Sequence, residues 1–402
     1  MYRVLLLFYT VYFYLLYLLV KLLTISFSFF KSKKVSNKII YLELFGPPMA
    51  GYTARSRYWS DLLRAKGYES DVYWVITYEQ YKQFMSKRHG LLLFQIKTLW
   101  KRVKQCWITR DAALIIVRRE LLMYNDYGNL FLEKWMRCMH KSLIIDFDDD
   151  IAAAKHEGQK RRTLFSWLML ESHTKFTSSL AYYDACIYGT EYLYQQFSSR
   201  AVSATRHLIL PTCVRDYAKP LKQYKGDNVI RIGWVGSSYN LRNIEAVFSQ
   251  LETLYERTAF EFILICDKVT TIHTTFPLRF IKWSEAAEVE NLLQIDIGLM
   301  PLFRNDTARG KAAFKLIQYM SLGIVSVASA VTINTDIIED GANGYLVEDE
   351  TKWVEVLDMV IRSRSQFAQI GEAAYSRISN TYTFDANEAT YLSFIKQQLT
   401  GA

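Results

Sequence analysis

The sequence of 402 residues lacks the cysteine and histidine spacings of a metal site. Its five cysteines form no Cys-x-x-Cys pair, and they do not combine with the six histidines in the pattern of a zinc ligand set. An odd, scattered set of cysteines is typical of reduced thiols in a cytosolic compartment. We therefore expect no bound metal and no structural zinc site.

A nucleic-acid-binding module is also missing. Lysine and arginine give the chain a net charge of +9, which favours anionic partners such as a nucleotide or a phospholipid surface. The basic residues are spread along the chain, however, so we expect no nucleic acid partner. Half of the residues are hydrophobic, which is enough for the cores of two domains of ordinary size.

Charge is absent from residues 4–20, and a second apolar segment, 22–30, follows the single Lys21. The first run is at the lower limit of length for a transmembrane helix, and no small-residue cleavage site of a signal peptide follows it. We expect residues 4–30 to anchor the chain in a membrane. The alternatives are a helix lying in the membrane interface and an apolar helix docked on the protein itself.

Lysines follow this segment at positions 31, 33, 34 and 38, whereas only Arg3 and the amino terminus precede it. The positive-inside rule therefore predicts a single N-terminal anchor in the inner or plasma membrane, with the globular part of the chain in the cytoplasm.

Apolar runs alternate with amphipathic helices along the rest of the chain, which indicates parallel sheets covered on both faces. In the N-terminal half we expect strands at residues 38–45, 71–76, 112–117, 142–146, 185–188 and 207–210, helices at 60–67, 129–140 and 164–179, and a basic helical region at 78–110. In the C-terminal half we expect strands at 230–236, 262–266, 279–283, 296–302 and 324–328, and helices at 243–255 and 386–399.

The most informative segment is a basic loop followed by a short amphipathic helix that Gly323 ends. Lys311 and Lys315 are four residues apart and would share one face near the helix N-terminus, where free N–H groups favour an anion. Arg309 adds a third positive charge just upstream. We interpret this arrangement as a diphosphate site; the alternative is a solvated basic face.

Several motifs, in the same order along the chain, resemble family 4 glycosyltransferases. They include Ile232-Gly-Trp-Val-Gly-Ser237, Asp296-Ile-Gly-Leu-Met-Pro-Leu302 and Asp340-Gly-Ala-Asn-Gly344 in the C-terminal half, and Gly46-Pro-Pro48, Arg118-Arg-Glu120 and Asp146-Phe-Asp-Asp-Asp150 in the N-terminal half. The resemblance implies an α/β protein of the GT-B fold, with two Rossmann-like domains facing across a cleft and, here, an N-terminal apolar helix.

The predicted domain organisation combines the resemblance with these elements. We expect a membrane-anchor helix and basic linker at residues 1–36, an N-terminal acceptor domain at 37–214, a linker at 215–227, a C-terminal nucleotide-sugar donor domain at 228–385, and a crossover helix at 386–402.

The resemblance also implies a donor site and a leaving group that the protein stabilises electrostatically. Many family members carry two glutamates eight residues apart, one for the sugar and one for the ribose, whereas this chain has Gly310 and Gln318. The amide of Gln318 can still bond to ribose hydroxyls, but the sugar contact loses its carboxylate. The predicted donor-binding residues are Gly236, Ser237, Arg309, Lys311, Lys315 and Gln318, with Lys311 also catalytic.

The acidic run after residues 142–146 supplies the other catalytic candidates. Asp148 and Asp149 stand where related enzymes often carry a His-Asp pair, which implies contact with the sugar or the acceptor hydroxyl. The alternative is an acidic turn in which Asp149 or Asp150 caps a helix. Arg57 and Glu120 are candidate acceptor or cleft residues; the alternatives are an arginine on a helix surface and a glutamate paired with a neighbouring arginine.

Together these features predict a retaining, hexosyltransferase-like enzyme. It would move a sugar from a nucleotide-sugar substrate to a glycan or lipid-linked acceptor at the cytoplasmic membrane face, in cell-surface polysaccharide synthesis, without a cofactor. Two alternatives remain: a non-catalytic GT-B protein that acts as a membrane-tethered binding module, and a nucleotide-sugar epimerase.

Overall fold

The computed structural model describes residues 8, 11, 12, 14–16, 18, 19, 21, 22, 35–80, 91–122, 130–140, 142–153, 173–202, 205–224, 229–268 and 272–400. The chain divides into two compact units. The first comprises Met1–Pro211 and Thr390–Ala402, and the second comprises Thr212–Ala389.

The first unit is built on six parallel strands in the order β2-β1-β3-β4-β5-β6. Every residue of β4 and β5 is buried, as expected for apolar strands that are covered on both faces. These strands confirm the predicted ones to within a few residues: β1 (Val35–Phe45), β2 (Glu69–Ile76), β3 (Ala112–Arg118), β4 (Leu143–Phe147), β5 (Ala185–Tyr188) and β6 (Arg206–Ile209).

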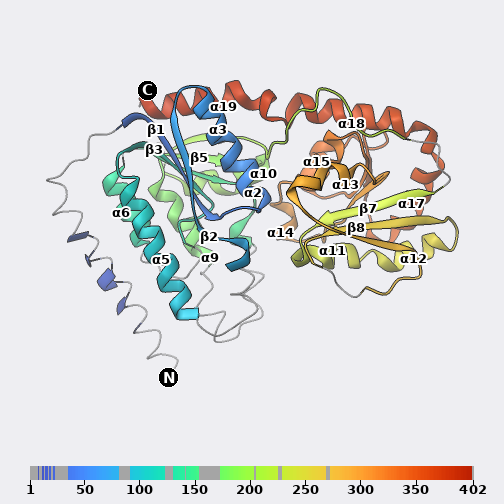
Figure 1. Ribbon diagram of the computed structural model, residues 1–402, viewed down its shortest axis with the longest axis horizontal. Coiled ribbons are helices and arrows are strands. Elements are labelled where there is room, and N and C mark those ends of the chain that lie inside the picture. Colours follow the sequence, from blue (N-terminus) through green and yellow to red (C-terminus); the bar gives the residue numbers. More distant parts are fainter. Residues whose placement is uncertain are drawn as a thin grey trace. The chain divides into compact units, whose positions relative to one another are not determined.

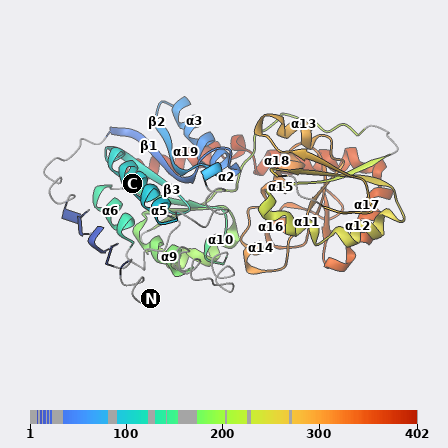
Figure 2. The ribbon, with the colours of Figure 1, turned by 60° about the horizontal axis from the view of Figure 1, so that its bottom comes forward.

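Helices cover both faces of this sheet (Figure 1). Helices α5 (Leu91–Ile108) and α6 (Phe131–Met139) lie side by side in Figures 1 and 2, and they share one core with Ile40 of β1. The next strand residue, Tyr41, points to the other face, where its hydroxyl bonds to that of Tyr391 in α19 (Phe384–Thr400). The other elements of the unit are α2 (Ala50–Tyr52), η1 (Thr53–Arg57), α3 (Tyr58–Ala65), α9 (His173–Ser179), η2 (Leu180–Tyr182), α10 (Glu191–Phe197) and η3 (Ser198–Arg200).

The second unit also has a six-stranded parallel sheet, in the order β12-β11-β10-β7-β8-β9. Its strands are β7 (Ile230–Gly236), β8 (Phe260–Cys266), β9 (Leu278–Lys282), β10 (Ile297–Met300), β11 (Val325–Ser329) and β12 (Tyr345–Val347). The first five confirm predicted strands. The last was not predicted, because three residues are too few to show a periodic pattern.

Helices lie on both faces of the second sheet as well. Figure 1 shows α11 and α12 on one side of β7 and β8, and α13 and α15 on the other. The predicted helix at residues 243–255 is two helices, α11 (Leu241–Glu245) and α12 (Phe248–Tyr255). The remaining elements are η4 (Ser238–Asn240), η5 (Glu285–Ala287), α13 (Glu288–Leu292), α14 (Asp306–Arg309), α15 (Phe314–Ser321), α16 (Thr332–Ile337), η6 (Glu350–Lys352), α17 (Trp353–Arg362), η7 (Arg364–Gln366) and α18 (Phe367–Thr381).

The strand order of each sheet identifies the point where its connections reverse direction. In the first sheet the chain passes from β1 to β2 and then continues with β3 on the other side of β1. In the second sheet it passes from β7 through β8 and β9 and continues with β10 on the other side of β7. Ligands of open parallel sheets bind beyond the carboxyl ends of the strands at such points. We therefore expect a ligand site beyond the carboxyl ends of β1 and β3 in the first sheet, and of β7 and β10 in the second.

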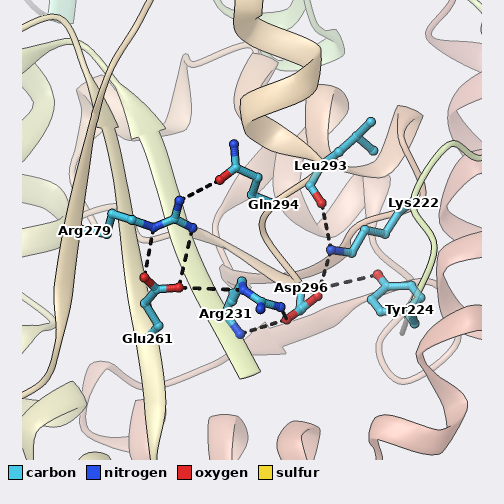
Figure 3. Close-up of polar contacts among 8 residues, drawn as sticks. All are labelled: Lys222, Tyr224, Arg231, Glu261, Arg279, Leu293, Gln294 and Asp296. Atoms are coloured by element: carbon cyan, nitrogen blue, oxygen red, sulfur yellow. Dashed lines mark hydrogen bonds and ion pairs between the residues drawn. The ribbon is translucent and has the colours of Figure 1, made fainter. Parts of the chain in front are cut away.

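The opposite edge of the second sheet carries an ion-pair network (Figure 3). Asp296, just before β10, accepts hydrogen bonds from the backbone N–H of Arg231 at 2.8 Å and from Lys222 Nζ at 2.7 Å. Arg279 Nε donates to Glu261 at 2.9 Å, and the Arg231 guanidinium lies 3.7 Å from the same carboxylate. Each of the two carboxylates at this edge is therefore paired with two basic side chains, which link the starts of neighbouring strands.

The segment predicted as a linker takes part in this packing. Tyr224 accepts a hydrogen bond from the backbone N–H of Val325 at 2.8 Å and donates to the carbonyl oxygen of Gly323 at 2.9 Å. The described part of the segment, through Lys222 and Tyr224, is thus a structural element of the second unit.

Most of the predicted anchor, residues 4–30, lies outside the described residues, so it stays a prediction. The described positions between 8 and 22 are helical, and Leu16 is buried in the core of the first unit. Within the described residues, no helix is long and apolar enough to cross a membrane.

The network in Figure 3 predicts a stability difference between two aspartate substitutions. Asp296→Ala leaves the Lys222 side chain, which is 5% exposed, without its carboxylate, and we expect the unfolding free energy to fall by about 3 kcal/mol. Asp358→Ala removes a partner of Arg362, which is 77% exposed, and is expected to cost less than about 1 kcal/mol. Urea unfolding followed by tryptophan fluorescence compares the two; equal losses would contradict this account.

Candidate functional site

The end of β7 brings Gly236 and Lys315 together. A Cβ atom at Gly236 would lie 2.7 Å from Lys315 Nζ and 2.4 Å from the ring of Trp234, so any larger residue would displace both side chains. The Lys315 ammonium lies over the Trp234 ring, 4.1 Å from its centroid. The absence of a side chain at position 236 is therefore what lets a lysine of α15 reach the carboxyl end of β7.

Lys315 has no acidic partner. The side chain makes no ion pair within the described part of the chain; the residue is half-buried, with its ammonium packed against the Trp234 ring. This burial, together with the nearby positive charge of Lys311, lowers the pKa of Lys315 to about 7. Two neighbouring cations, neither paired with a carboxylate among the described residues, form a site that attracts an anion.

Lys311 was predicted to lie on the same helix as Lys315, and this is wrong. The helix begins at Phe314, after Ala313 adopts a left-handed conformation with φ 49°. Lys311 therefore lies in the preceding loop, and it approaches Lys315 through the turn rather than along a helix face. Lys311 is nevertheless near enough for its positive charge to lower the pKa of Lys315.

The other predicted donor residues are less buried. Ser237 Oγ accepts a hydrogen bond from Asn240 Nδ2 at 3.2 Å, and it directly follows β7. Gln318 lies on α15 and is half-buried. Arg309 is 61% exposed at the end of α14 and lies 3.9 Å from Asp306. The structure thus groups Gly236, Lys315 and Lys311, whereas Arg309 extends toward solvent.

The carboxyl edge of the first sheet has a different charge pattern, because its arginines are paired. Arg118 at the end of β3 donates from Nη2 to Asp148 at 2.5 Å. Arg55 on η1 donates from Nε to Asp146 at 3.2 Å and from Nη1 to the carbonyl oxygen of Leu210 at 2.7 Å. Each arginine therefore has a carboxylate beside it.

The acidic run divides into three environments. Burial alone would raise the pKa of Asp148, but Arg118, Arg55 and Arg119 lower it well below the usual range. Asp149 is 41% exposed and lies 3.5 Å from Arg119. Asp150 accepts a hydrogen bond from the backbone N–H of Ala153 at 2.8 Å, so Asp150 takes the helix-capping role that was weighed for this run.

Glu43 near the end of β1 is a further member of this edge that the sequence did not single out. Burial raises its pKa to about 7, against the lowering influence of Arg118 and of Ser56. Ser56 on η1 donates to the Glu43 carboxylate at 2.5 Å.

In the described ranges, no group of three or more His, Cys, Asp or Glu side chains is arranged to hold a metal ion.

The candidate cleft residues Arg57 and Glu120 lie in contrasting places. Arg57 is 53% exposed and lies 3.9 Å from Asp61, whereas Glu120 is buried just beyond β3. Sequence reasoning missed Arg55, which is completely buried. Both arginines belong to η1, a π-helical turn, so ordinary helical spacing does not show which of them faces the core.

Comparisons with known proteins agree with this architecture. No protein-family model matches the chain, and no curated protein has a similar sequence. Solved structures do match: a sucrose-phosphate synthase from Thermosynechococcus elongatus is 11% identical with a TM-score of 0.66, over 91% of this chain and 100% of that one. HepE from Anabaena, in complex with UDP and glucose, is 12% identical with a TM-score of 0.63, over 89% and 99%.

A glycosyltransferase from Rickettsia africae is a third match, 10% identical with a TM-score of 0.61 over 91% of this chain and 100% of that one. This chain has the GT-B fold. The two Rossmann-like units that the sequence motifs implied are thereby confirmed, with one six-stranded parallel sheet in each, whereas the N-terminal apolar helix stays a prediction.

The pKa of Lys315 predicts a pH dependence for anion binding. Only the protonated lysine attracts a diphosphate, so we expect affinity to be highest below pH 7 and to fall by up to about 10-fold per pH unit above it. Calorimetric titration with UDP, GDP and ADP measures this. Lys315→Met should bind more weakly and lose the dependence; an identical pH profile in the variant would contradict the assignment.

The two arginines of η1 provide a matched pair for stability. Arg55→Met leaves the buried Asp146 without its cation, and we expect a loss of about 3–5 kcal/mol. Arg57→Met changes an exposed side chain and is expected to stay within about 0.5 kcal/mol of the wild type. Denaturant titration by circular dichroism separates them, and a larger effect at Arg57 would overturn the placement.

Proposed function

We propose that the protein is a glycosyltransferase that uses a nucleotide sugar, and that Lys311 and Lys315 hold the diphosphate of the donor. One observation carries this proposal: Lys315, with Lys311 near it, lies at the carboxyl end of β7, where the connections of the second sheet reverse, and neither lysine has an acidic partner among the described residues. A nucleoside diphosphate supplies the negative charge that this site lacks.

The solved structures support the same chemistry. HepE is described with UDP and glucose, and the other two matches are named as a sucrose-phosphate synthase and a glycosyltransferase. Each shares the GT-B fold with this chain at low sequence identity. The assignment of a nucleotide-sugar donor therefore rests on the local charge of the second unit together with the fold.

In the proposed reaction, the bond between the sugar C1 and the diphosphate oxygen breaks while C1 bonds to the acceptor oxygen. Negative charge grows on the leaving diphosphate, and Lys315, with Lys311, stabilises it in a site partly shielded from water. Binding of the diphosphate keeps Lys315 protonated despite its lowered pKa. The resemblance to family 4 implies retention of configuration, with the acceptor proton passing to the leaving phosphate.

Asp148 is better suited to orient a substrate hydroxyl than to act as a general base. A carboxylate whose pKa is lowered by three arginines accepts a proton poorly. We propose that Asp148 and Asp149 bind sugar or acceptor hydroxyls, with Arg57 and Glu120 as further acceptor contacts. On the donor side, Ser237 would contact the diphosphate, Gln318 the ribose hydroxyls, and Arg309 would close over the donor.

A membrane location completes the proposal. Residues 4–30 would tether the catalytic units at the cytoplasmic face of the inner or plasma membrane, near a growing glycan or lipid-linked acceptor. The support is the uncharged run at 4–20, the lysines after it, and the apolar side chains that its described residues expose, such as Phe8, Leu15 and Leu22. Synthesis of a cell-surface polysaccharide fits an acceptor held in this membrane.

The test is nucleotide release from UDP-, GDP- and ADP-sugars by detergent-solubilised protein, with and without a membrane lipid extract. We expect release from one donor, dependent on the extract and reduced on the order of 10²–10³-fold in Lys311→Ala/Lys315→Ala, because both cations act on the leaving group.

Lys352→Ala, an exposed lysine of the same unit, is the control and should retain full activity. Donor consumption without any acceptor would indicate an epimerase or hydrolase. Donor binding without release of nucleotide would indicate a binding module. Either result, or equal activity in the double variant, would contradict the proposal.

A further inference from the structure

Helix α5 presents a basic and aromatic face to solvent. Trp100 is 47% exposed and Ile108 is 39% exposed, and the lysines of the same face are exposed too. Lys97, Trp100, Lys104 and Ile108 follow one another at intervals of three or four residues, so they form one stripe along the helix. Lys101 lies beside this stripe. We call these five residues the α5 face.

The orientation of this helix is fixed by its opposite side. Arg102 is fully buried and donates from Nε to the carbonyl oxygen of Leu121 at 2.8 Å, and Gln105 donates to the carbonyl oxygen of Trp74 at 2.8 Å. Leu99 and Cys106 belong to the core of the first unit. The helix therefore cannot rotate to bury the α5 face without breaking this packing.

The charge of the helix has a single sign. Residues 91–110 contain lysines and arginines but no aspartate or glutamate. Within the described residues of the helix, Lys97 and Lys104 make no ion pair, and Lys101 donates to the carbonyl oxygen of Val75 at 3.0 Å. Exposed cations around an exposed tryptophan match the chemistry of an anionic headgroup layer, where indole rings sit and lysines extend to the lipid phosphates.

The same unit exposes a second apolar surface near the chain start. Among the described helical residues there, Phe8, Val11, Leu15, Leu18 and Leu22 recur at intervals of three and four and are between 37% and 68% exposed. Leu16, in contrast, is buried against the core of the first unit. One unit thus carries both an apolar stripe and a basic aromatic stripe.

We propose that the α5 face binds the anionic headgroups of a lipid bilayer, with Trp100 at the boundary between headgroups and acyl chains. The first unit would then rest on the membrane surface through α5, in addition to any attachment through residues 4–30. The occupant is a lipid surface rather than a protein groove ligand, because the stripe combines only cations with large apolar side chains. The proposal is independent of sugar transfer.

The experiment is flotation of the full chain with vesicles of phosphatidylcholine alone and of phosphatidylcholine mixed with phosphatidylglycerol. The wild type should prefer the anionic vesicles. Lys97→Gln/Lys104→Gln should lose on the order of 20-fold of that preference, since each lysine near an anionic surface is worth about fivefold. Trp100→Ser should weaken binding to both kinds of vesicle.

The matched control is Lys66→Gln/Lys396→Gln, which removes two exposed lysines of the same unit outside α5. It should bind like the wild type, and circular dichroism melting should show that all variants fold. Two results would overturn the proposal: an unchanged anionic preference in the α5 variant, or equal losses in the variant and the control. Binding of the α5 face to RNA instead of vesicles would also refute it.

Discussion

The approach of Lys315 to the end of β7 is the contact on which the proposed chemistry depends. It requires that Gly236 has no side chain and that the Trp234 ring faces the ammonium. It also requires that α15 begins at Phe314, which places Lys315 in the first turn of the helix, next to the strand. Burial makes this charge costly, as the pKa of about 7 records. A bound anion would offset that cost by pairing with the ammonium group of Lys315.

The two sheets handle charge at their carboxyl edges in different ways. The first pairs two buried arginines with aspartates, Arg55 with Asp146 and Arg118 with Asp148. The second leaves Lys311 and Lys315 unpaired by any described acidic side chain. Because a compensated edge has little attraction for a phosphate, the difference supports our proposal that the second unit binds the anionic part of a substrate and the first unit its hydroxyl groups. At the amino edge of the second sheet, by contrast, both carboxylates are paired with basic side chains, and we expect these pairs to stabilise the fold.

Much of the fold could be predicted because buried parallel strands are continuous apolar runs. Such runs identified β7 to its last residue and gave the alternating pattern of both sheets. The site was predicted in part: Gly236 and Lys315 were both singled out, although their contact spans 79 residues of sequence and only the folded chain shows it. The parts of the site that could not be predicted depend on local backbone geometry. No sequence pattern predicts the left-handed conformation of Ala313, which makes the helix begin after Lys311. The π-helical turn has a different residue spacing from an α-helix, so the sequence did not show that Arg55 is buried and Arg57 exposed.

A crystal structure of the protein with the nucleoside diphosphate that it binds tests the central claim most directly. The account predicts diphosphate oxygens within hydrogen-bond distance of Lys315 Nζ, beside the backbone of Gly236 and Ser237, with Lys311 closing on the same group. A nucleotide bound elsewhere, with Lys315 still directed at Trp234 and no phosphate beside it, would contradict the account.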